Sequence, residues 1–461
     1  MELTRRSFLK AAGAAFATSM AFEFMSPSPA LAVGSSPEWK LVNTEEYTNI
    51  CCYCAGGCGS LCSVRDGELI NLEGDPDHPI NEGGLCPKGA TMFQLRNVVD
   101  PETGEIIKNP DRVTKPLVRR PGAKDWEDIS WEQAVEEIAR KVKDTRDETF
   151  IETNEDGLTV NYTPAMASLG GSQENSEEEY LILKMMRSLG IVAVDNQARV
   201  CHSSTVVGLA PTFGRGSMTS HWSDMANADY ILHCGSNSCE SHPTSSLHLH
   251  RAHDRGAKWI VVDPRYTRTA EQADIYCPIR SGTDIAFYGG MYKYIIDNLI
   301  EPGLAEYTAT GKNSDIYNFE YLINYTNASY LLDPAFGFDE ETGHFTGWDE
   351  ESKSYDNHTW HYQVESEEKW DTSASGDYAW VSKPGTPEFT PPVFTKPKRD
   401  MSLQDPNCVY QQFKKHYERY DLDTVCSICG MSKETLELVY KTYTESGAPG
   451  KSGTILYAHF R

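Results

Sequence analysis

Six cysteines lie close together near the amino end of the chain, and their spacing is typical of a metal-binding loop. Residues 49–62 read Asn-Ile-Cys-Cys-Tyr-Cys-Ala-Gly-Gly-Cys-Gly-Ser-Leu-Cys, and a further cysteine follows in Leu-Cys-Pro-Lys-Gly at residues 85–89. Cys51, Cys54, Cys58 and Cys86 give the spacing Cys-x2-Cys-x3-Cys-x27-Cys. A [4Fe-4S] cluster needs four thiolates, and the intervening glycines let the backbone turn tightly. The sequence therefore predicts an iron–sulfur cluster.

Two other interpretations of these cysteines compete with the cluster. Tetrahedral zinc also takes four cysteines, but zinc ribbons favour two separated Cys-x2-Cys pairs rather than a run of three and one distant residue. Disulfides are the third interpretation. Because four ligands are required, Cys52 and Cys62 are surplus. The spacing alone leaves open whether Cys51 or Cys52 is the first ligand.

A second candidate site is the segment Asp-Asn-Gln-Ala-Arg-Val-Cys-His at residues 195–202. It directly follows a predicted strand, where α/β sheets place their ligands. The soft thiolate of Cys201 suits a redox metal, and the imidazole of His202 can transfer a proton near neutral pH. A Cys-His pair alone is a weak signal, because an isolated histidine is more often structural.

Two further polar segments follow predicted strands at residues 230–234 and 258–262. Gly235-Ser-Asn237 offers backbone N–H groups and an amide, and residues 263–269, Asp-Pro-Arg-Tyr-Thr-Arg-Thr, offer a carboxylate, two guanidiniums and hydroxyls. This combination suits a nucleotide with a guanine edge and a pyrophosphate. An ordinary solvated loop is the alternative.

The elements that must position these segments alternate between helix and strand. A Ser-x-x-Gln start at Ser130 predicts a helix with apolar residues from Ala134 to Val142. Residues 165–169 predict a buried strand, and Asn175 or Ser176 begins a helix over 177–189 that ends at Gly190. A strand over 191–194 follows, and residues 230–264 form a βαβ unit. The fold class expected is α/β, with several domains.

Size, charge and the amino-terminal segment limit the functional classes. A chain of 461 residues is too long to pack around a single hydrophobic core, so we expect more than one packed unit. The 42 Lys and Arg against 67 Asp and Glu give a net charge of -25, which argues against a nucleic-acid partner. The Arg5-Arg6 pair, an apolar stretch and Ala30-Leu-Ala32 predict a twin-arginine signal peptide over residues 1–32. We therefore expect export to the periplasm.

An acidic segment interrupts the second half of the chain. Residues 339–377 hold twelve Asp or Glu against two Lys, but six aromatic residues are interleaved with them. Disorder is the usual explanation of such a run, whereas the aromatic residues favour a folded surface insertion near residues 335–400. Cys426-x2-Cys429 has redox spacing without the helix-start context, so no redox role is predicted.

Taken together, the motifs resemble the large (alpha) subunits of respiratory formate dehydrogenases, within the molybdopterin oxidoreductases of the dimethyl sulfoxide reductase superfamily. The resemblance covers roughly residues 37–458. The segments that carry it are the cysteine loop, residues 85–89, Ala-Arg-Val-Cys-His at 198–202, residues 209–216 and 218–222, the loop from Asp263, residues 325–329 and residues 454–458.

The resemblance implies a [4Fe-4S] cluster and a molybdenum or tungsten bis-molybdopterin guanine dinucleotide. Cys51, Cys54, Cys58 and Cys86 would hold the cluster, and Lys88 would lie between cluster and pterin. Cys201 would ligate the metal where many relatives have selenocysteine, and His202 would accept the proton. The implied cofactor-binding residues are Lys88, Arg199, Gly235, Asn237, Glu240, Asp263, Arg265, Thr267, Gly282 and Asp284.

The resemblance also implies an architecture and partners. The expected domains are a small iron–sulfur domain over 33–110, the first part of an α/β domain over 111–190, and a Rossmann-like molybdopterin-binding domain over 191–461. Formate would be oxidised to carbon dioxide, with electrons passing to an iron–sulfur beta subunit and a membrane cytochrome b gamma subunit. Because family members continue well beyond residue 461, we expect this chain to be an amino-terminal part. A nitrate or sulfur-oxyanion enzyme, or an inactive fragment, is the alternative.

Overall fold

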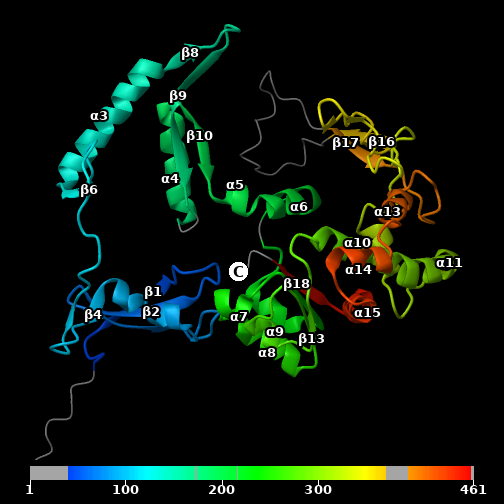
Figure 1. Ribbon diagram of the computed structural model, residues 1–461, viewed down its shortest axis with the longest axis horizontal. Helices are drawn as coiled ribbons and strands as arrows, with labels where there is room; N and C mark the ends of the chain where they lie inside the picture. Colours follow the sequence, from blue (N-terminus) through cyan, green and yellow to red (C-terminus); the bar gives the residue numbers. More distant parts are fainter. Residues whose placement is uncertain (1–39, 172–173, 215, 217, 370–392, 458–461) are drawn as a thin grey trace, which may run out of the picture.

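The computed structural model describes residues 40–171, 174–214, 216, 218–369 and 393–457. The predicted signal peptide and part of the acidic segment lie outside these residues, as do the side chains of residues 200 and 201. Figure 1 shows the amino-terminal unit, in blue, beside a central sheet in green, with a separate helix-and-strand arm above them.

The amino-terminal unit is built on a three-stranded antiparallel sheet, β1 (Glu45–Ile50), β2 (Gly59–Arg65) and β3 (Glu68–Gly74). Ile50 pairs with Gly59, so residues 51–58 form the loop between β1 and β2. The short helix α2 (Pro87–Ala90) and η1 (Met92–Leu95) follow. Two short hairpins complete the unit and lead out of it: β4 (Asn97–Val99) with β5 (Ile106–Lys108), and β6 (Leu117–Val118) with β7 (Glu127–Asp128). The sheet therefore presents the cysteine loop at one end.

The arm consists of α3 (Trp131–Thr149), β8 (Ile151–Thr153), β9 (Thr159–Gly170), α4 (Ser176–Leu189) and β10 (Ile191–Asn196), with strand order β10-β9-β8. Ser130 caps α3 by accepting from the Gln133 N–H, although the Gln133 side chain bonds Glu137 and does not complete the box. Asn175 and Glu178 form a full capping box on α4, and Gly190 ends that helix with a φ of 81°. The helices and strands predicted for this region are confirmed.

The predicted burial of the strand over 165–169 is wrong. Leu169 is 84% exposed, and Val192 on the neighbouring strand is 68% exposed. On α3, Val135 and Ile138 are also exposed. The apolar pattern did identify the strand and the helix, but burial requires another layer against these faces. Within the described part of the chain, no such layer covers them.

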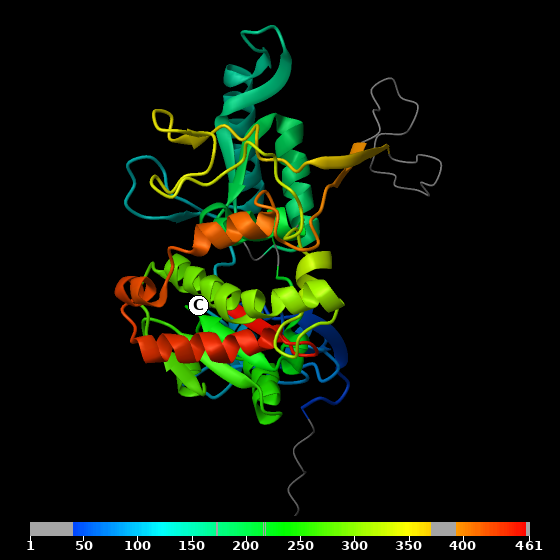
Figure 2. The ribbon, with the colours of Figure 1, turned by 90° about the vertical axis from the view of Figure 1, so that its right-hand side faces the viewer.

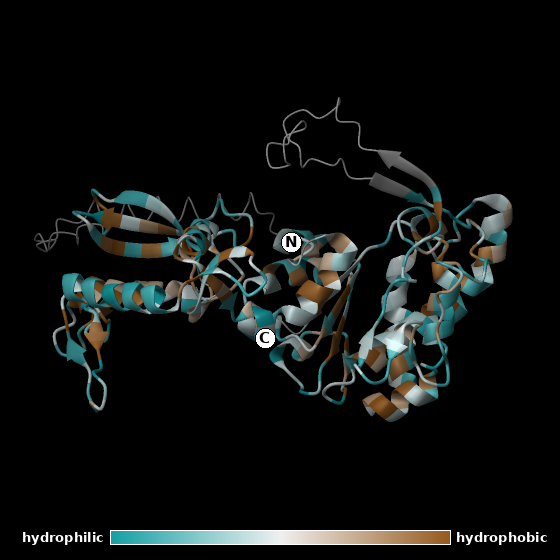
Figure 3. Ribbon diagram, turned by 90° about the horizontal axis from the view of Figure 1, so that it is seen from above, coloured by the Kyte–Doolittle hydropathy of each residue, from teal (hydrophilic) through white to brown (hydrophobic). Residues whose placement is uncertain are grey.

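The central sheet is parallel, with strand order β13-β12-β11-β18. Its strands are β11 (Tyr230–Cys234), β12 (Lys258–Val262), β13 (Ile275–Cys277) and β18 (Gly453–Tyr457). Helices α7 (Ser238–Ser241) and α8 (Ser245–Asp254) connect β11 to β12, and α9 (Arg268–Glu271) connects β12 to β13. Alternate residues of each strand point to opposite faces. Trp259 and Val261 therefore join a core with Trp222 and Leu249, while Ile260 and Val262 join a second core. Figure 3 shows these strands as predominantly hydrophobic.

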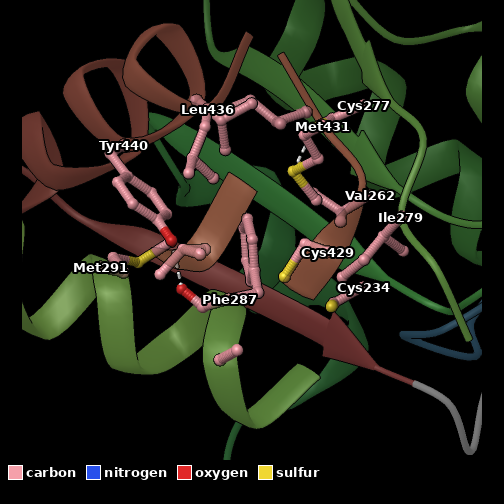
Figure 4. Packing of buried hydrophobic residues seen from close by; sticks show 14 of the residues in the cluster. Cys234, Val262, Cys277, Ile279, Phe287, Met291, Cys429, Met431, Leu436 and Tyr440 are labelled. Atoms are coloured by element: carbon pink, nitrogen blue, oxygen red, sulfur yellow. Dashed lines mark hydrogen bonds between the residues drawn. The ribbon is translucent and has the colours of Figure 1, made fainter. Parts of the chain in front are cut away.

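The second core packs helices against the opposite face of the sheet. Helices α10 (Asp284–Ile295) and α15 (Lys433–Thr444) cover this face (Figure 2), and α14 (Leu422–Cys429) packs beside them. Phe287, Leu436 and Tyr440 are fully buried, and the Tyr440 hydroxyl donates to the Phe287 carbonyl. Figure 4 shows this contact together with the sulfur contact between Cys277 and Met431, 3.3 Å apart. The α/β fold class predicted from the sequence is confirmed.

The remaining elements form a third packed region and short connections. They are α5 (Ala198–Cys201), α6 (Ser203–Phe213), η2 (Trp222–Asn227), η3 (Ile296–Ile300), α11 (Glu301–Thr310), α12 (Phe319–Asn324), β14 (Trp348–Asp349), β15 (Ser354–Tyr355), β16 (Val364–Lys369), β17 (Val393–Pro397), α13 (Val409–Tyr417) and η4 (Glu445–Gly447). The described part of the acidic insertion is folded, because Phe336, Phe345 and Trp360 make ring contacts. Of the helices described, none has the length and apolarity needed to span a bilayer.

Candidate metal and cofactor site

The cysteine loop closes on itself through its own backbone. The Cys51 N–H donates to the Cys58 carbonyl at 2.8 Å, and the Gly57 N–H donates to the Cys54 carbonyl at 3.3 Å. Cys51 and Cys58 are buried, at 8% and 5% exposed. Cys86 lies just before α2, and the charges of Cys54 and Cys86 both act on Cys58. The structure thus brings the four predicted ligands to one place.

Two glycines leave the space that these sulfurs occupy. A Cβ atom on Gly56 would lie 3.3 Å from the Cys54 sulfur and 3.9 Å from the Cys58 sulfur. A Cβ atom on Gly89 would lie 3.7 Å from the Cys51 sulfur. A side chain on Gly56 would therefore crowd the Cys54 sulfur, and one on Gly89 would fill the space beside the Cys51 sulfur, whereas glycine leaves a cradle that fits a cluster.

Electrostatics also favour a cationic core among these sulfurs. Burial raises the pKa of the Cys51 and Cys58 thiols, and repulsion from the neighbouring cysteines adds to the effect. Four adjacent thiolates are stable only when metal cations compensate their charge. Among the described residues, no three His, Cys, Asp or Glu side chains are arranged around a single ion.

The two surplus cysteines differ from the other four in their positions. Cys52 is exposed, in contrast to its buried neighbour Cys51. Cys62 lies within β2, opposite Tyr47 of β1, and burial raises the pKa of its thiol. The choice of Cys51 over Cys52 stays a prediction, which the difference in burial supports.

Lys88 lies between the cysteine loop and the central sheet. It belongs to α2, two residues after Cys86, and its Nζ donates to the Glu240 carbonyl of α7 at 3.4 Å. Burial lowers the pKa of His242 to about 4, and the charge of Lys88 acts in the same direction. Lys88 therefore contacts the segment that follows β11, and its place between cluster and pterin stays a prediction.

The predicted nucleotide-binding residues after β11 form a connected polar group. Gly235 has a φ of 65°, and its N–H donates to the Val262 carbonyl. The Asn237 side chain accepts from the Thr269 hydroxyl at 2.9 Å and donates to the Glu240 carboxylate. Arg268 is ion-paired with Glu240 at 3.3 Å. The carboxyl end of β11 thus carries both donors and acceptors.

The predicted residues after β12 and β13 lie at the same edge. The Asp263 carboxylate accepts from the Arg265 N–H at 2.8 Å, and the Thr267 hydroxyl accepts from the Ala270 N–H at 3.1 Å, which begins α9. Gly282 has a φ of 80° in the turn before α10. Asp284 lies 3.6 Å from the Cys234 sulfur, which ends β11. These residues meet because the carboxyl ends of parallel strands share one edge of the sheet.

The predicted metal-binding segment begins at the end of β10. Cys201 is the last residue of α5, and its side chain lies outside the described part of the structure. The His202 N–H donates to the Ala198 carbonyl at 2.9 Å. The exposed Arg199 guanidinium is ion-paired at 3.0 Å with Asp195, which lies four residues earlier in β10. Figure 1 places α5 between the arm and the central sheet.

Sequence reasoning missed one face of α8. Thr244, His248 and Arg251 all contact the cysteine-bearing unit: Thr244 lies 3.2 Å from the Cys58 sulfur, His248 bonds the Ile80 carbonyl at 2.7 Å, and Arg251 forms two bonds to Glu82 at 2.6 and 2.7 Å. Polar residues at intervals of four and three share one helix face. The spacing of these three residues is visible in the sequence, but the residues that they contact are not.

Comparison with known proteins agrees with this geometry. Residues 44–97 match a family model described as the molybdopterin oxidoreductase Fe4S4 domain, and residues 112–302 match the molybdopterin oxidoreductase model. Together the two models cover more than half of the chain. The chain belongs to the molybdopterin oxidoreductase family. The predicted [4Fe-4S] cluster and molybdopterin cofactor are therefore confirmed, and the zinc and disulfide interpretations are set aside.

Several members of this family are similar over almost the whole chain. The formate dehydrogenase subunit alpha of Megalodesulfovibrio gigas is 41% identical over 99% of this chain, and the formate dehydrogenase-O major subunit of Escherichia coli is 39% identical over 99%. In each case the chain spans 40% of the relative's length. The solved structure of acetylene hydratase from Pelobacter acetylenicus has a TM-score of 0.54 and 21% identity over 88% of this chain and 39% of its own, which shows a shared fold.

Proposed function

We propose that this chain carries the catalytic centre of a formate dehydrogenase, which oxidises formate to carbon dioxide and releases a proton and two electrons. The observation that carries the proposal is the similarity to formate dehydrogenase subunits across 99% of the chain, at 36 to 41% identity. A nitrate reductase of Symbiobacterium thermophilum is 32% identical over only 66% of the chain. Formate is therefore favoured over nitrate.

The proposed roles follow from where the residues lie. When bound, a molybdenum or tungsten centre with two molybdopterin guanine dinucleotides supplies the acceptor for the two electrons. Cys201 would hold that metal as a thiolate, and His202 beside it would accept the proton at its imidazole. Asp195 holds the Arg199 guanidinium in place by their ion pair. This ion pair joins the end of β10 to α5, the helix that ends at Cys201.

The polar edge of the central sheet would bind the guanine dinucleotides. Asn237 and Asp263 are nearly buried, at 7% and 6% exposed, and both are held by hydrogen bonds. An immobilised amide and carboxylate can recognise the polar edge of a guanine, and Arg265 can pair with a pyrophosphate. Lys88 would bring a positive charge between this edge and the cysteine loop.

Export and partner subunits belong to the same proposal. The twin-arginine pattern at Arg5-Arg6 supports transport of the folded protein to the periplasm. The relatives named above are designated alpha or major subunits. We infer an iron–sulfur beta subunit and a membrane cytochrome b gamma subunit as partners, serving anaerobic respiration.

Formate-dependent dye reduction, measured together with iron, molybdenum and tungsten content, tests the proposal. The protein should be purified without oxygen after expression in a host that makes the pterin cofactor. Cys201→Ser replaces a soft sulfur ligand with a harder oxygen and should abolish formate oxidation while leaving the iron content unchanged. Near-normal activity of Cys201→Ser, or reduction of nitrate without oxidation of formate, would contradict the proposal.

A further inference from the structure

Helix α8 joins the cysteine loop to the central sheet through three side chains on one face. Thr244, at the start of the helix, contacts the Cys58 sulfur; His248 follows one turn later and Arg251 nearly two turns later. Thr244 contacts the cysteine loop, whereas His248 and Arg251 both contact the segment that holds Ile80 and Glu82. The helix also follows β11, whose carboxyl end carries Gly235 and Asn237. One rigid element therefore fixes the cysteines relative to the nucleotide-binding edge.

The Thr244 hydroxyl is used in an unusual way for its position. A threonine at a helix N-cap commonly accepts a hydrogen bond from a backbone N–H of the first turn. Thr244 makes no such bond in α8, and its oxygen lies 3.2 Å from the Cys58 sulfur. A Cβ atom on Gly56 would lie 3.4 Å from the same oxygen. The hydroxyl is therefore fitted closely against the loop.

The direction of this hydrogen bond follows from the state of the sulfur. With a cluster bound, Cys58 is a thiolate and has no proton, so the Thr244 hydroxyl must donate. Cys58 is 5% exposed, which leaves little room for water to replace the hydroxyl. A donor to a ligand sulfur stabilises the added electron of a reduced cluster, and such bonds help set reduction potentials.

We propose that Thr244 raises the reduction potential of the [4Fe-4S] cluster by donating a hydrogen bond to the Cys58 sulfur. His248 and Arg251 join α8 to the same unit through Ile80 and Glu82, whereas the effect on the potential comes from the Thr244 hydroxyl. The proposal rests on the cluster, and it is independent of the choice of formate as substrate. Thr244 tunes the potential of the first electron carrier next to the pterin site.

A redox titration of the purified chain, followed by electron paramagnetic resonance, tests this role. Thr244→Val keeps the volume of the side chain and removes the donor, so the midpoint potential should shift to a lower value. Thr244→Ser restores a hydroxyl and should return the potential close to that of the parent. An unchanged potential in Thr244→Val, or an equal shift in both variants, overturns the proposal.

Two control variants separate this effect from helix movement and from general destabilisation. The double variant Glu82→Gln with Arg251→Gln removes the ion pair without changing the net charge, and it should leave the potential near that of the parent. Thr308→Val removes a hydroxyl that bonds the Leu304 carbonyl on α11, which Figure 1 places on the opposite side of the molecule. A shift in either control as large as that of Thr244→Val would contradict the assignment.

A second measurement applies even if Thr244→Val loses its cluster. Electron–nuclear double resonance of the parent and Thr244→Ser, compared in H2O and D2O, should show an exchangeable proton coupled to the cluster that an intact Thr244→Val lacks. Absence of that proton in the parent refutes the hydrogen bond. A parent that binds no iron refutes the cluster and this proposal together, whereas a parent with a cluster and no effect of Thr244 refutes this proposal alone.

Discussion

Asn81 joins the two segments that carry the predicted cluster ligands, and its removal gives a quantitative test of the site. The side chain is 1% exposed. Its oxygen accepts from the Gly59 N–H at 2.8 Å, and its nitrogen donates to the carbonyls of Gly59 and Gly84, both at 2.9 Å. Gly59 directly follows Cys58, and Gly84 lies two residues before Cys86. One amide thus fixes both segments.

The cost of Asn81→Ala can be worked out group by group. The Gly59 N–H is buried and would lose its acceptor, which costs about 1–3 kcal/mol. The Gly59 carbonyl still accepts from the Asp75 N–H at 3.1 Å, and the Gly84 carbonyl belongs to an exposed residue that water can reach. Each of these two lost bonds is therefore worth about 0.5–1 kcal/mol. The expected total is about 2–5 kcal/mol of the stability of this unit.

Thermal unfolding and iron content of the purified protein measure this cost. Asn81→Ala should unfold at a lower temperature and retain less iron, and Asn81→Asp should be no better, because a carboxylate cannot donate to the two carbonyls. Asn71→Ala is the matched control, since within the described residues the Asn71 side chain makes a single exposed bond, to Lys40 at 3.4 Å. Stability within about 0.5 kcal/mol of the parent, with full iron content, would refute the reasoning.

Three further predictions concern the cysteines, the proton acceptor and a buried histidine. Cys54→Ala should remove the visible absorbance of the cluster and Cys62→Ala should retain it, so equal losses would overturn the ligand choice. His202→Ala should keep the metal but slow formate-dependent dye reduction by about 10²–10⁴-fold, in a preparation that the parent shows to be active. Burial lowers the pKa of His233 to about 3, and Trp259 donates to its Nδ1. In the unfolded chain the His233 imidazole binds a proton near pH 6.5, whereas in the folded protein it does so only near pH 3. The contribution of neutral His233 to the free energy of unfolding is therefore complete above pH 6.5. It is lost as the pH falls toward 3, at up to about 1.4 kcal/mol per pH unit. Urea unfolding midpoints at pH 7 and pH 5 should differ less in His233→Gln than in the parent.

Local patterns in the sequence predicted the elements well, because the signals that begin and end helices are local. Ser130 and Asn175 both cap helices at the predicted places, and Gly190 ends α4. The βαβ unit was visible for the same reason, since its two strands are apolar and each is followed by polar residues. The positions of the predicted nucleotide-binding residues then follow from the rule that ligands lie at the carboxyl ends of parallel strands.

Contacts between distant segments could not be predicted in this way. Thr244 and Cys58 are 186 residues apart, and neither local sequence indicates that the two residues are in contact. The exposure of Leu169 has a related cause, because an apolar pattern shows which face can be buried and not whether another layer covers it. The roles of Cys201 and His202 came from resemblance, since a Cys-His pair alone has too many structural explanations.

The place of β18 in the central sheet has a consequence for synthesis on the ribosome. β11 has β12 on one side and β18 on the other, although β18 is made roughly 220 residues later, which takes on the order of ten to forty seconds at typical bacterial rates. During that interval one edge of β11 has no partner strand from this sheet, and such an edge can pair with other chains. Nascent chains of this protein therefore pass through a long aggregation-prone stage, and slower translation or a lack of chaperones should lower its soluble yield.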